Sequence, residues 1–219
     1  MKIKACIFDL DGVVVDTARY HYLAWKKIAD DLGFNFSVHD NERLKGVSRM
    51  ESLDILLEIG KIKADPHKKE ELAATKNRLY ISYIQKMTSD EILPGVIRFL
   101  DELRNDGIYT ALGSASKNAM SILDKINIAQ KFDVVIDGNK VSRAKPDPEV
   151  FLKGAAELNI DPRNCLVFED AQAGIDAALN GGMHVIGIGQ PENLKNAEFV
   201  IPGFETMNMK QLKSWYSEV

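Results

Sequence analysis

Apolar residues are distributed differently in three parts of the chain. The first part is a short apolar run over residues 3–10, closed by an Asp-Gly turn, and it is too short for a helix. It therefore predicts a buried strand. The second part, residues 17–88, has almost no strand pattern, and its apolar residues recur at the spacing of amphipathic helices. The helices expected there are residues 20–32, 50–59 and 72–87.

From about residue 93 onward, short apolar runs alternate with amphipathic stretches. The expected strands are residues 109–113, 134–136, 165–168, 184–188 and 199–201. The expected helices are residues 96–103, 117–126, 148–158, 174–179 and 210–216, the third with Asp147 as its N-cap and Pro148 as its first residue. Such alternation predicts parallel strands joined by right-handed crossovers, with helices on both faces of the sheet. We therefore expect a doubly wound, Rossmann-like α/β core domain, residues 1–16 and 89–219, with an inserted all-helical cap domain, residues 17–88.

The composition narrows the class of protein. Of the 219 residues, 45% are hydrophobic and 27% are charged, as in a globular protein with a buried core. The net charge of -4 at pH 7 disfavours a nucleic-acid partner, which usually requires a basic surface. No apolar run approaches the roughly 20 residues that span a bilayer, and the N-terminus reaches Asp9 before it could form a signal-peptide core. We therefore expect no membrane partner.

The two cysteines, Cys6 and Cys165, both lie in expected strands, and the chain has neither a disulfide framework nor paired metal-ligand spacing. Reduced thiols in a protein core predict a cytoplasmic location. No unpaired apolar stripe is evident along the chain, so we also expect a monomer.

Polar residues gather where the expected strands end. They are Asp9, Asp11, Ser114, Lys145, Glu169 and Asp170. Because ligands of open α/β sheets bind outside the carboxyl ends of the strands, these residues are candidates for a functional site. Four carboxylates at one edge would repel one another unless a cation lay among them, and Mg²⁺ favours carboxylate oxygens together with water and substrate phosphate. The edge therefore predicts a magnesium site.

The acidic residues also have simpler interpretations. A calcium loop after Asp11 would need oxygen ligands at positions 13 and 15, which are both valine, so an EF-hand does not fit. Glu169 and Asp170, taken alone, would serve equally well at the N-terminus of the helix that follows them.

A basic residue and a hydroxyl group complete the edge. Lys145 precedes Pro146, which favours an extended backbone and directs the lysine toward the strand ends. A Lys-Pro pair is more often a solvated loop, but this site needs positive charge to hold a phosphate beside Asp9. Ser114 offers a hydroxyl, and the amides that begin the next helix would form an anion site. The chain has no dinucleotide or Walker glycine pattern, so the edge predicts phosphoryl transfer in which Lys145 and Ser114 offset developing charge.

In their order along the chain, these residues resemble the four motifs of the haloacid dehalogenase superfamily, in its phosphotransferase branch. The motifs are residues 9–12, Ser114, residues 145–146 and residues 169–170. The resemblance covers nearly the whole chain and implies that Asp9 is the nucleophile, forming an aspartyl phosphate, and that Asp11 is the general acid and base. It also implies a helical cap that closes over the site. The Mg²⁺ ligands that it implies are Asp9, the backbone carbonyl of Asp11, Glu169 and Asp170.

The cap resembles that of the β-phosphoglucomutases, a family of mutases in this superfamily. The matching residues are Thr17, His21, Trp25, Lys45, Gly46, Val47, Arg49, Ser52 and Lys76 in the cap and Ala115, Ser116, Lys117 and Asn118 in the core. The resemblance implies that Arg49 and residues 116–118 hold the phosphate that is not transferred. Residues 45–47, Ser52 and Lys76 would line the sugar site. His21 would lie near Asp11 and Thr17 would act as a hinge, while Trp25 is more simply a residue of the cap core. The chain departs from the mutase pattern at Ala171, where serine is frequent.

The implied activity is a phosphomutase that interconverts β-D-glucose 1-phosphate and glucose 6-phosphate. Phosphorylated Asp9 would give its phosphate to the 6-hydroxyl, and the 1-phosphate of the resulting β-glucose 1,6-bisphosphate would return to Asp9. Glucose 1,6-bisphosphate would thus be both intermediate and primer. The alternatives are a sugar-phosphate phosphatase, a mutase for another hexose 1-phosphate and a non-enzymatic regulator. A regulator would be expected to have lost Asp9, Asp11 or Lys145.

Overall fold

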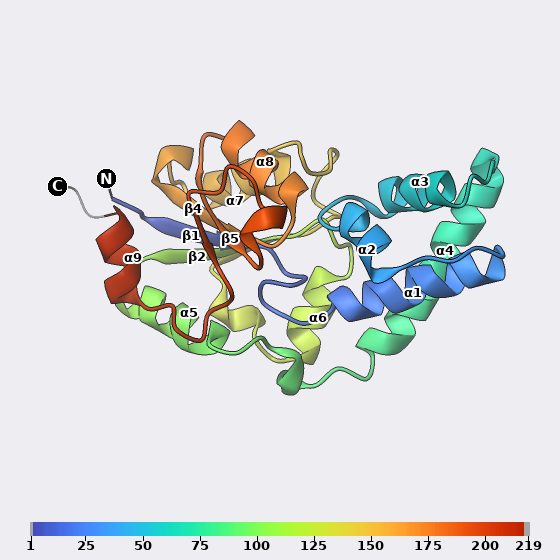
Figure 1. The fold of residues 1–219 in the computed structure, drawn as a ribbon. Coiled ribbons are helices and arrows are strands. Elements are labelled where there is room, and N and C mark those ends of the chain that lie inside the picture. The colour runs from blue at the N-terminus through green and yellow to red at the C-terminus, as the bar shows by residue number, and fades with distance from the viewer. Residues whose placement is uncertain (1, 217–219) are drawn as a thin grey trace.

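The structure is a computed structural model that describes residues 2–216, in which a parallel sheet lies between helices and a second group of helices lies to one side (Figure 1). The strands are β1 (Ala5–Phe8), β2 (Tyr109–Gly113), β3 (Val134–Ile136), β4 (Cys165–Glu169), β5 (His184–Ile188) and β6 (Phe199–Ile201). Their order in the sheet is β3-β2-β1-β4-β5-β6, so the chain adds strands on both sides of β1. The predicted doubly wound α/β core is confirmed.

The register of the sheet aligns the carboxyl ends of its central strands. Phe8 of β1 pairs with Leu112 of β2 on one side and with Phe168 of β4 on the other. The segments that follow these three strands therefore meet at one place. Every residue of β1 is buried, as expected where helices cover both faces of a parallel sheet. The apolar run at the N-terminus thus forms the centre of the sheet.

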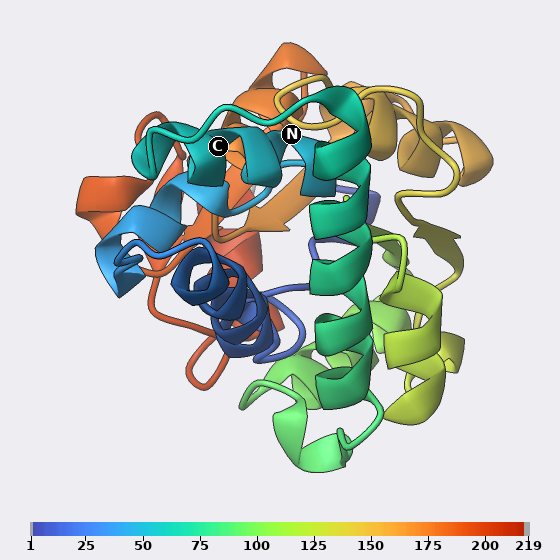
Figure 2. The same ribbon diagram turned by 90° about the vertical axis from the view of Figure 1, so that its right-hand side faces the viewer.

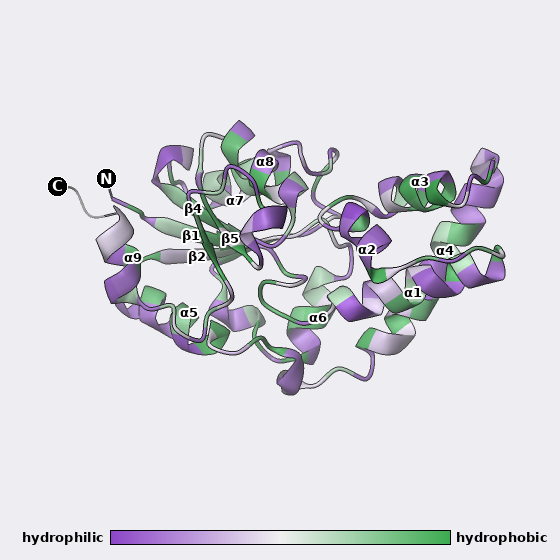
Figure 3. Ribbon diagram, in the orientation of Figure 1, coloured by the Kyte–Doolittle hydropathy of each residue, from purple (hydrophilic) through white to green (hydrophobic). Residues whose placement is uncertain are grey.

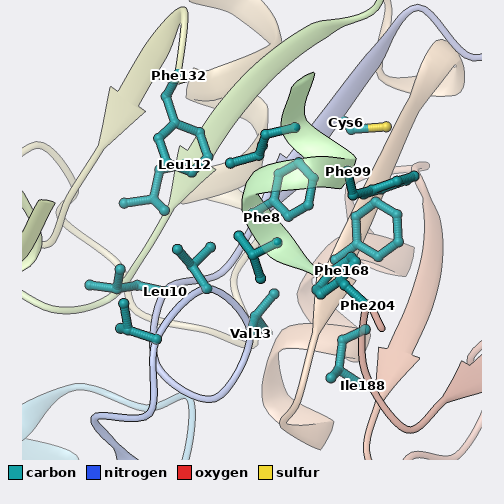
Figure 4. Close-up of a cluster of buried hydrophobic side chains, with 14 of the residues drawn as sticks. Cys6, Phe8, Leu10, Val13, Phe99, Leu112, Phe132, Phe168, Ile188 and Phe204 are labelled. Atoms are coloured by element: carbon teal, nitrogen blue, oxygen red, sulfur yellow. The ribbon is translucent and has the colours of Figure 1, made fainter. Parts of the chain in front are cut away.

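The core helices cover the sheet on both faces. They are α5 (Val96–Asn105), α6 (Ala119–Lys125), α7 (Glu149–Glu157), α8 (Gln172–Asn180) and α9 (Met209–Tyr216). Successive residues of β1 point to opposite faces, so Cys6 and Phe8 belong to one hydrophobic cluster and Ala5 and Ile7 to another. In the first cluster, the rings of Phe8 and Phe168 stack with their centroids 4.9 Å apart (Figure 4).

The inserted helices form a unit with its own hydrophobic cluster. They are α1 (Ala18–Asp31), α2 (Val38–Asn41), α3 (Arg49–Ile59) and α4 (Pro66–Ile84), and α4 runs along the side of this unit (Figure 2). Their cluster includes Trp25, Ile28, Phe36 and Leu53 and is separate from the two clusters of the sheet. Colouring by hydropathy shows mostly hydrophobic strands, whereas the cap helices carry both hydrophobic and hydrophilic residues (Figure 3). The predicted helical cap is confirmed.

Three of the local differences between the predicted and the observed elements involve polar side chains near the start of a helix. Helix α4 begins at Pro66 and not at residue 72, because the Asp65 side chain accepts a hydrogen bond from the Lys68 amide at 2.8 Å and starts the helix before the apolar spacing begins. The short helix α2 was not predicted, since its residues carry a capping box and almost no apolar pattern. Pro148 is the N-cap of α7, although Asp147 still accepts the Glu149 amide at 2.9 Å.

Two linkers join the cap to the core, and they lie side by side. Val15 forms an isolated antiparallel bridge with Ile92, and the amide of Asp16 donates to the carbonyl of Glu91 at 2.9 Å. The core ends predicted at residues 1 and 219 lie outside the described residues. Within the described chain, no helix has both the length and the apolar character that crossing a membrane requires.

Candidate active site

A cavity of about 460 Å³ lies where the strand ends meet the cap. The core contributes Asp9, Asp11, Asp170 and residues 114–118 and 141–145 to its lining. The cap contributes His21, Trp25, residues 44–50, Ser52, Lys76 and Tyr80. Residues that are far apart in the sequence therefore face one cavity.

Asp9 directly follows β1, and Lys145 reaches it from the loop between β3 and α7. The Nζ atom of Lys145 lies 2.5 Å from Oδ1 of Asp9 and 2.8 Å from Oε2 of Glu169, and all three residues are buried. Burial alone would lower the pKa of Lys145, but the charges of Asp9 and Glu169 raise it above its ordinary value. Lys145 is therefore a lasting positive charge beside Asp9.

Three carboxylates at the ends of β1 and β4 lie close enough to share a cation. Oxygen atoms of Asp9, Glu169 and Asp170 all lie within 4.8 Å of one another. Burial raises the pKa of Glu169 and of Asp170, and the charge of Asp9 adds to the increase. Gly12 leaves room for the Asp170 carboxylate, because a Cβ atom at position 12 would lie 2.3 Å from Oδ2 of Asp170. A divalent cation would offset the repulsion among these oxygens, so the donor set fits Mg²⁺.

The carboxylate of Asp11 is directed toward the cap. Its Oδ1 atom accepts a hydrogen bond from the Thr17 hydroxyl and another from the Tyr80 hydroxyl at 3.4 Å. The Nε2 atom of His21 lies 3.6 Å from the same oxygen. Burial and the charge of Asp9 raise the pKa of Asp11 to about 6. A carboxyl group with this pKa changes its protonation near neutral pH, which suits acid-base catalysis.

Helix α4 places a buried lysine in the cavity. The Nζ atom of Lys76 lies 2.9 Å from Nδ1 of His21 and 4.9 and 4.7 Å from the ring centroids of Trp25 and Tyr80. Burial and the charge of Arg49 lower the pKa of Lys76 to about 7. Burial and the charge of Lys76 hold the pKa of His21 well below its ordinary value, so His21 is neutral. Trp25 thus belongs to the cap cluster and also faces Lys76.

In the loop between β2 and α6, serine side chains accept hydrogen bonds from backbone amides of the same loop. The Oγ atom of Ser114 accepts the Ser116 amide at 3.1 Å, and the Oγ atom of Ser116 accepts the Asn118 amide at 3.2 Å. Side chains of the loop therefore already bind these two amides. The amides that begin α6 follow them, and the anion site expected there stays a prediction. Lys117 contributes to the cavity lining, and α6 begins only at Ala119.

The loop before α3 touches the core at two points. The Nζ atom of Lys45 lies 3.7 Å from Oδ2 of Asp170. The neighbouring Gly46 has a φ of +73°, and a Cβ atom there would lie 2.9 Å from the Cβ atom of Ala171. A larger residue at either position would force the loop and the core apart. Position 171, where the chain departs from the mutase pattern, is therefore a contact between core and cap.

Comparison with known proteins agrees with this geometry. The haloacid dehalogenase-like hydrolase family matches residues 3–182. The chain belongs to this family. The chain is 44% identical over 201 residues to the β-phosphoglucomutase of Bacillus subtilis strain 168, and the aligned region covers 91% of this chain and 89% of that protein. It is 32% identical to a phosphorylated carbohydrates phosphatase of Thermotoga maritima, with 84% of each chain covered. The crystal structure of a β-phosphoglucomutase from Clostridium difficile superimposes with a TM-score of 0.92 and 44% identity, covering 98% of this chain and 97% of that one.

Two residues that the mutase resemblance singles out, one as a hinge and one for the sugar site, make other contacts within this haloacid dehalogenase-like hydrolase. Thr17 is fully buried, donates to Asp11 and does not occur among the described residues that line the cavity. Ser52 lines the cavity, but its hydroxyl donates to the carbonyl of Ser48 at 3.0 Å, one turn earlier in the chain. Thr17 therefore contacts the general acid-base candidate and not the cavity.

Several cavity residues have no role predicted from the sequence. Tyr80 follows Lys76 by four positions, so helical spacing alone places both on one face of α4, and this signal was available. Asn77 accepts a hydrogen bond from Asn118 at 3.2 Å, which joins cap and core across the cavity. Residues 141–144 also line it. No periodic pattern marks these loop residues, so only the tertiary structure identifies them.

Proposed function

We propose that this protein is a phosphomutase that interconverts β-D-glucose 1-phosphate and glucose 6-phosphate. The observation that carries the proposal is that one cavity is lined by two groups of cationic residues, and we assign one phosphate to each. Asp9 and Lys145 form one of them, and Arg49 and Lys117 line the cavity as cations that do not contact Asp9. A phosphatase needs one such place, whereas a mutase must hold two phosphates of one sugar. Similarity to two β-phosphoglucomutases supports the choice of substrate.

In the first half of the reaction, phosphorylated Asp9 transfers its phosphoryl group to the 6-hydroxyl of β-glucose 1-phosphate. The bond between phosphorus and the Asp9 oxygen breaks, a bond to the sugar O6 forms, and the hydroxyl proton passes to the carboxylate of Asp11. Arg49 holds the 1-phosphate, because its planar guanidinium group donates two parallel hydrogen bonds to phosphate oxygens. Ser116, Lys117 and Asn118 complete this phosphate site.

In the second half, the bisphosphate presents its 1-phosphate to Asp9. The Asp9 carboxylate attacks that phosphorus, the bond to the sugar O1 breaks, and Asp11 returns its proton to O1. Glucose 6-phosphate leaves, and Asp9 carries a phosphoryl group again. Asp11 thus alternates between base and acid, for which a pKa of about 6 is suited.

Charge at the transferring phosphoryl group is balanced by residues at the strand ends. Lys145 holds a positive charge against Asp9, and the Ser114 hydroxyl adds a hydrogen-bond donor. Mg²⁺, when held by Asp9, the backbone carbonyl of Asp11, Glu169 and Asp170, would neutralise further negative charge on the phosphoryl oxygens. The carboxylate of Asp11 lies apart from the three-carboxylate group and stays available for proton transfer.

The cap supplies the sugar site and excludes water. Lys45, Gly46, Val47, Ser52 and Lys76 line the part of the cavity that the sugar would occupy. Exclusion of water favours transfer to sugar over hydrolysis of the aspartyl phosphate. Thr17 and His21, at the base of the cap, both lie at the Asp11 carboxylate. Cap closure would therefore also bring Asp11 into its working orientation, with Thr17 in a hinge segment.

Phosphorus NMR tests the proposal directly. β-Glucose 1-phosphate is supplied with Mg²⁺ and a trace of glucose 1,6-bisphosphate as primer. We expect glucose 6-phosphate to grow while inorganic phosphate stays minor, and a chelator of divalent cations to stop the conversion. Asp9→Asn, which cannot form the aspartyl phosphate, is the matched control.

Growth of inorganic phosphate in place of glucose 6-phosphate would instead establish a sugar-phosphate phosphatase. The similarity to a phosphorylated carbohydrates phosphatase is the observation that favours this second candidate. Conversion of a different hexose 1-phosphate at a higher kcat/KM would identify a mutase with another substrate.

The remaining expectations belong to the same proposal. The cap would comprise residues 17–88 and the core residues 1–16 and 89–219, with a monomer in the cytoplasm. Light scattering measures the mass in solution, and cell fractionation measures the location. A hydrogen-exchange experiment with and without substrate would show whether residues 17–88 respond as one unit.

A further inference from the structure

The loop that carries Lys145 is held from outside the cavity by two residues of α7. Residues 141–145 line the cavity, whereas Glu149 and Lys153 do not occur among the described residues that line it. Glu149 lies in the first turn of α7, and Lys153 follows four residues later. Their side chains therefore lie on the same face of the helix.

Glu149 binds the backbone just before Lys145. Its Oε2 atom accepts hydrogen bonds from the Ser142 amide at 3.0 Å, from the Ser142 hydroxyl at 2.9 Å and from the Arg143 amide at 2.7 Å. The Glu149 side chain is only 11% exposed, although it belongs to the first turn of a surface helix. One carboxylate oxygen thus fixes two consecutive backbone amides of the loop.

Lys153 binds the beginning of the same loop. Its Nζ atom lies 2.7 Å from Oε1 of Glu149 and donates to the carbonyl of Lys140 at 2.6 Å. The two side chains form a clamp, Glu149 and Lys153, that spans residues 140–143. Helix α7 also supports Lys145 itself, whose Nζ atom lies 4.7 Å from the ring centroid of Phe151.

We infer that the clamp positions Lys145 against Asp9 and thereby sets the rate of phosphoryl transfer. Lysine has a long, flexible side chain, so its charged group stays within 2.5 Å of Asp9 only if its backbone is held. A small displacement of a charge at the reacting atoms costs far more rate than affinity. Glu149 and Lys153 are therefore positioning residues that act through the loop. The inference rests on transfer at Asp9 but holds whether the acceptor is a sugar or water.

Three variants and one control test the clamp. The variants are Glu149→Ala, Lys153→Met and the two combined. The control is Glu157→Gln, which removes a half-exposed carboxylate from the same helix; its partner, at 4.0 Å, is the Lys140 side chain and not the backbone of the loop. We expect kcat of the folded enzyme to fall about tenfold in each single variant, with KM changing less than kcat, because a misplaced catalytic charge slows the chemical step. The double variant should be no slower than the worse single variant, since both residues act as one unit. Glu157→Gln should match the unmodified protein.

Amide hydrogen exchange provides a readout that does not depend on activity. We expect the peptide that contains Ser142 and Arg143 to exchange faster in Glu149→Ala and unchanged in Glu157→Gln. Faster exchange with unchanged kcat would overturn the inference, and so would a rise in KM alone, because the loop would then only form a cavity wall. A lower melting temperature with normal kcat and KM of the folded fraction would also overturn it.

Different measurements would contradict the proposed function and the role of the clamp. Glucose 6-phosphate and inorganic phosphate are measured in the same samples, so absence of mutase turnover in the unmodified protein counts against the proposed function alone. The ratio of variant to unmodified kcat, for whichever product forms, tests the clamp.

Discussion

The core and cap sides of the cavity each carry a buried lysine, and the two lysines have opposite surroundings. Lys145 on the core side contacts two carboxylates, which raise its pKa above the ordinary value. Lys76 on the cap side is buried beside Arg49, and its pKa falls to about 7. The charge of Lys145 is therefore paired with carboxylates, whereas Lys76 and Arg49 have no carboxylate at ion-pair distance among the described residues. The difference indicates that the core is built for the reacting phosphoryl group and the cap for an incoming anion.

The largest expected effect lies at the core side. Asp9→Asn removes the proposed nucleophile and should lower turnover by about 10⁴-fold or more, because an amide cannot form the aspartyl phosphate. Mass spectrometry after incubation with glucose 1,6-bisphosphate should find the phosphate adduct in the unmodified protein and none in the variant. An adduct in Asp9→Asn would move the covalent chemistry to another residue and break the comparison.

Asp11→Asn should lower the rate by about 10²–10⁴-fold, the range of general acid-base catalysis. Because burial and the charge of Asp9 raise the pKa of Asp11 to about 6, the carboxyl group is protonated below that pH and cannot accept a proton. We therefore expect kcat/KM for β-glucose 1-phosphate to rise as the pH increases through about 6. The profile of the variant should lack this limb, and a residual rate above about a hundredth would exclude the assigned role.

On the cap side, Arg49→Ala should weaken the binding of β-glucose 1-phosphate and leave the bond-breaking step at Asp9 unchanged. Loss of a charge-assisted contact to phosphate of about 1.5–3 kcal/mol corresponds to a rise in KM of roughly tenfold to hundredfold. Hydrolysis of a small phosphate ester that lacks a second phosphate should be nearly unchanged. The contrast is measured by assaying both substrates with the same preparations, and equal losses on both would remove the distinction between the two sides.

The smallest expected effect concerns stability. The pKa of Lys76 falls from 10.5 to about 7 on folding, so between these pH values the unfolded chain holds a proton that the folded chain does not. This lysine therefore destabilises the fold as the pH falls from 10.5 toward 7. Lys76→Met should raise the free energy of unfolding by about 1–3 kcal/mol at pH 7, with less gain at higher pH.

Urea unfolding at pH 7 and at pH 9.5 measures this difference. Lys125→Met, at an exposed lysine outside the cavity, is the matched control for loss of a lysine charge. An equal gain at both pH values would show that packing and not charge burial causes the effect, and the opposite surroundings of the two lysines would then have no energetic consequence.

Helices and strands were predicted correctly where apolar spacing and a glycine stop within one segment mark the element. The strand at residues 109–113 matches β2, and the helix predicted at residues 96–103 lies within α5, because apolar spacing and glycine stops mark both elements. Prediction failed at α2 and at the first turns of α4, where side-chain caps start helices that have little apolar pattern. Capping of this kind depends on one or two polar side chains, so periodicity does not detect it.

The residues of the candidate site were likewise predicted only where a local pattern marks them. The positions that follow the expected strands were sufficient to predict Asp9, Glu169 and Lys145, since the carboxyl ends of parallel strands meet at one edge of the sheet. Neither the role of Asn77 nor that of the clamp residue Glu149 was predicted. Their partners lie in segments that only the folded chain brings near them.

The sequence by itself therefore determined the alternation of elements, the inserted cap and the set of residues at the strand ends, because these follow from patterns within short segments. Only the tertiary structure decided that Asp11 is directed toward Thr17 and Tyr80, that Ser114 and Ser116 bind backbone amides of their own loop, and that α7 holds the loop of Lys145. The physical reason is that side-chain direction, burial and pKa depend on contacts between distant segments, and local sequence patterns do not contain those contacts.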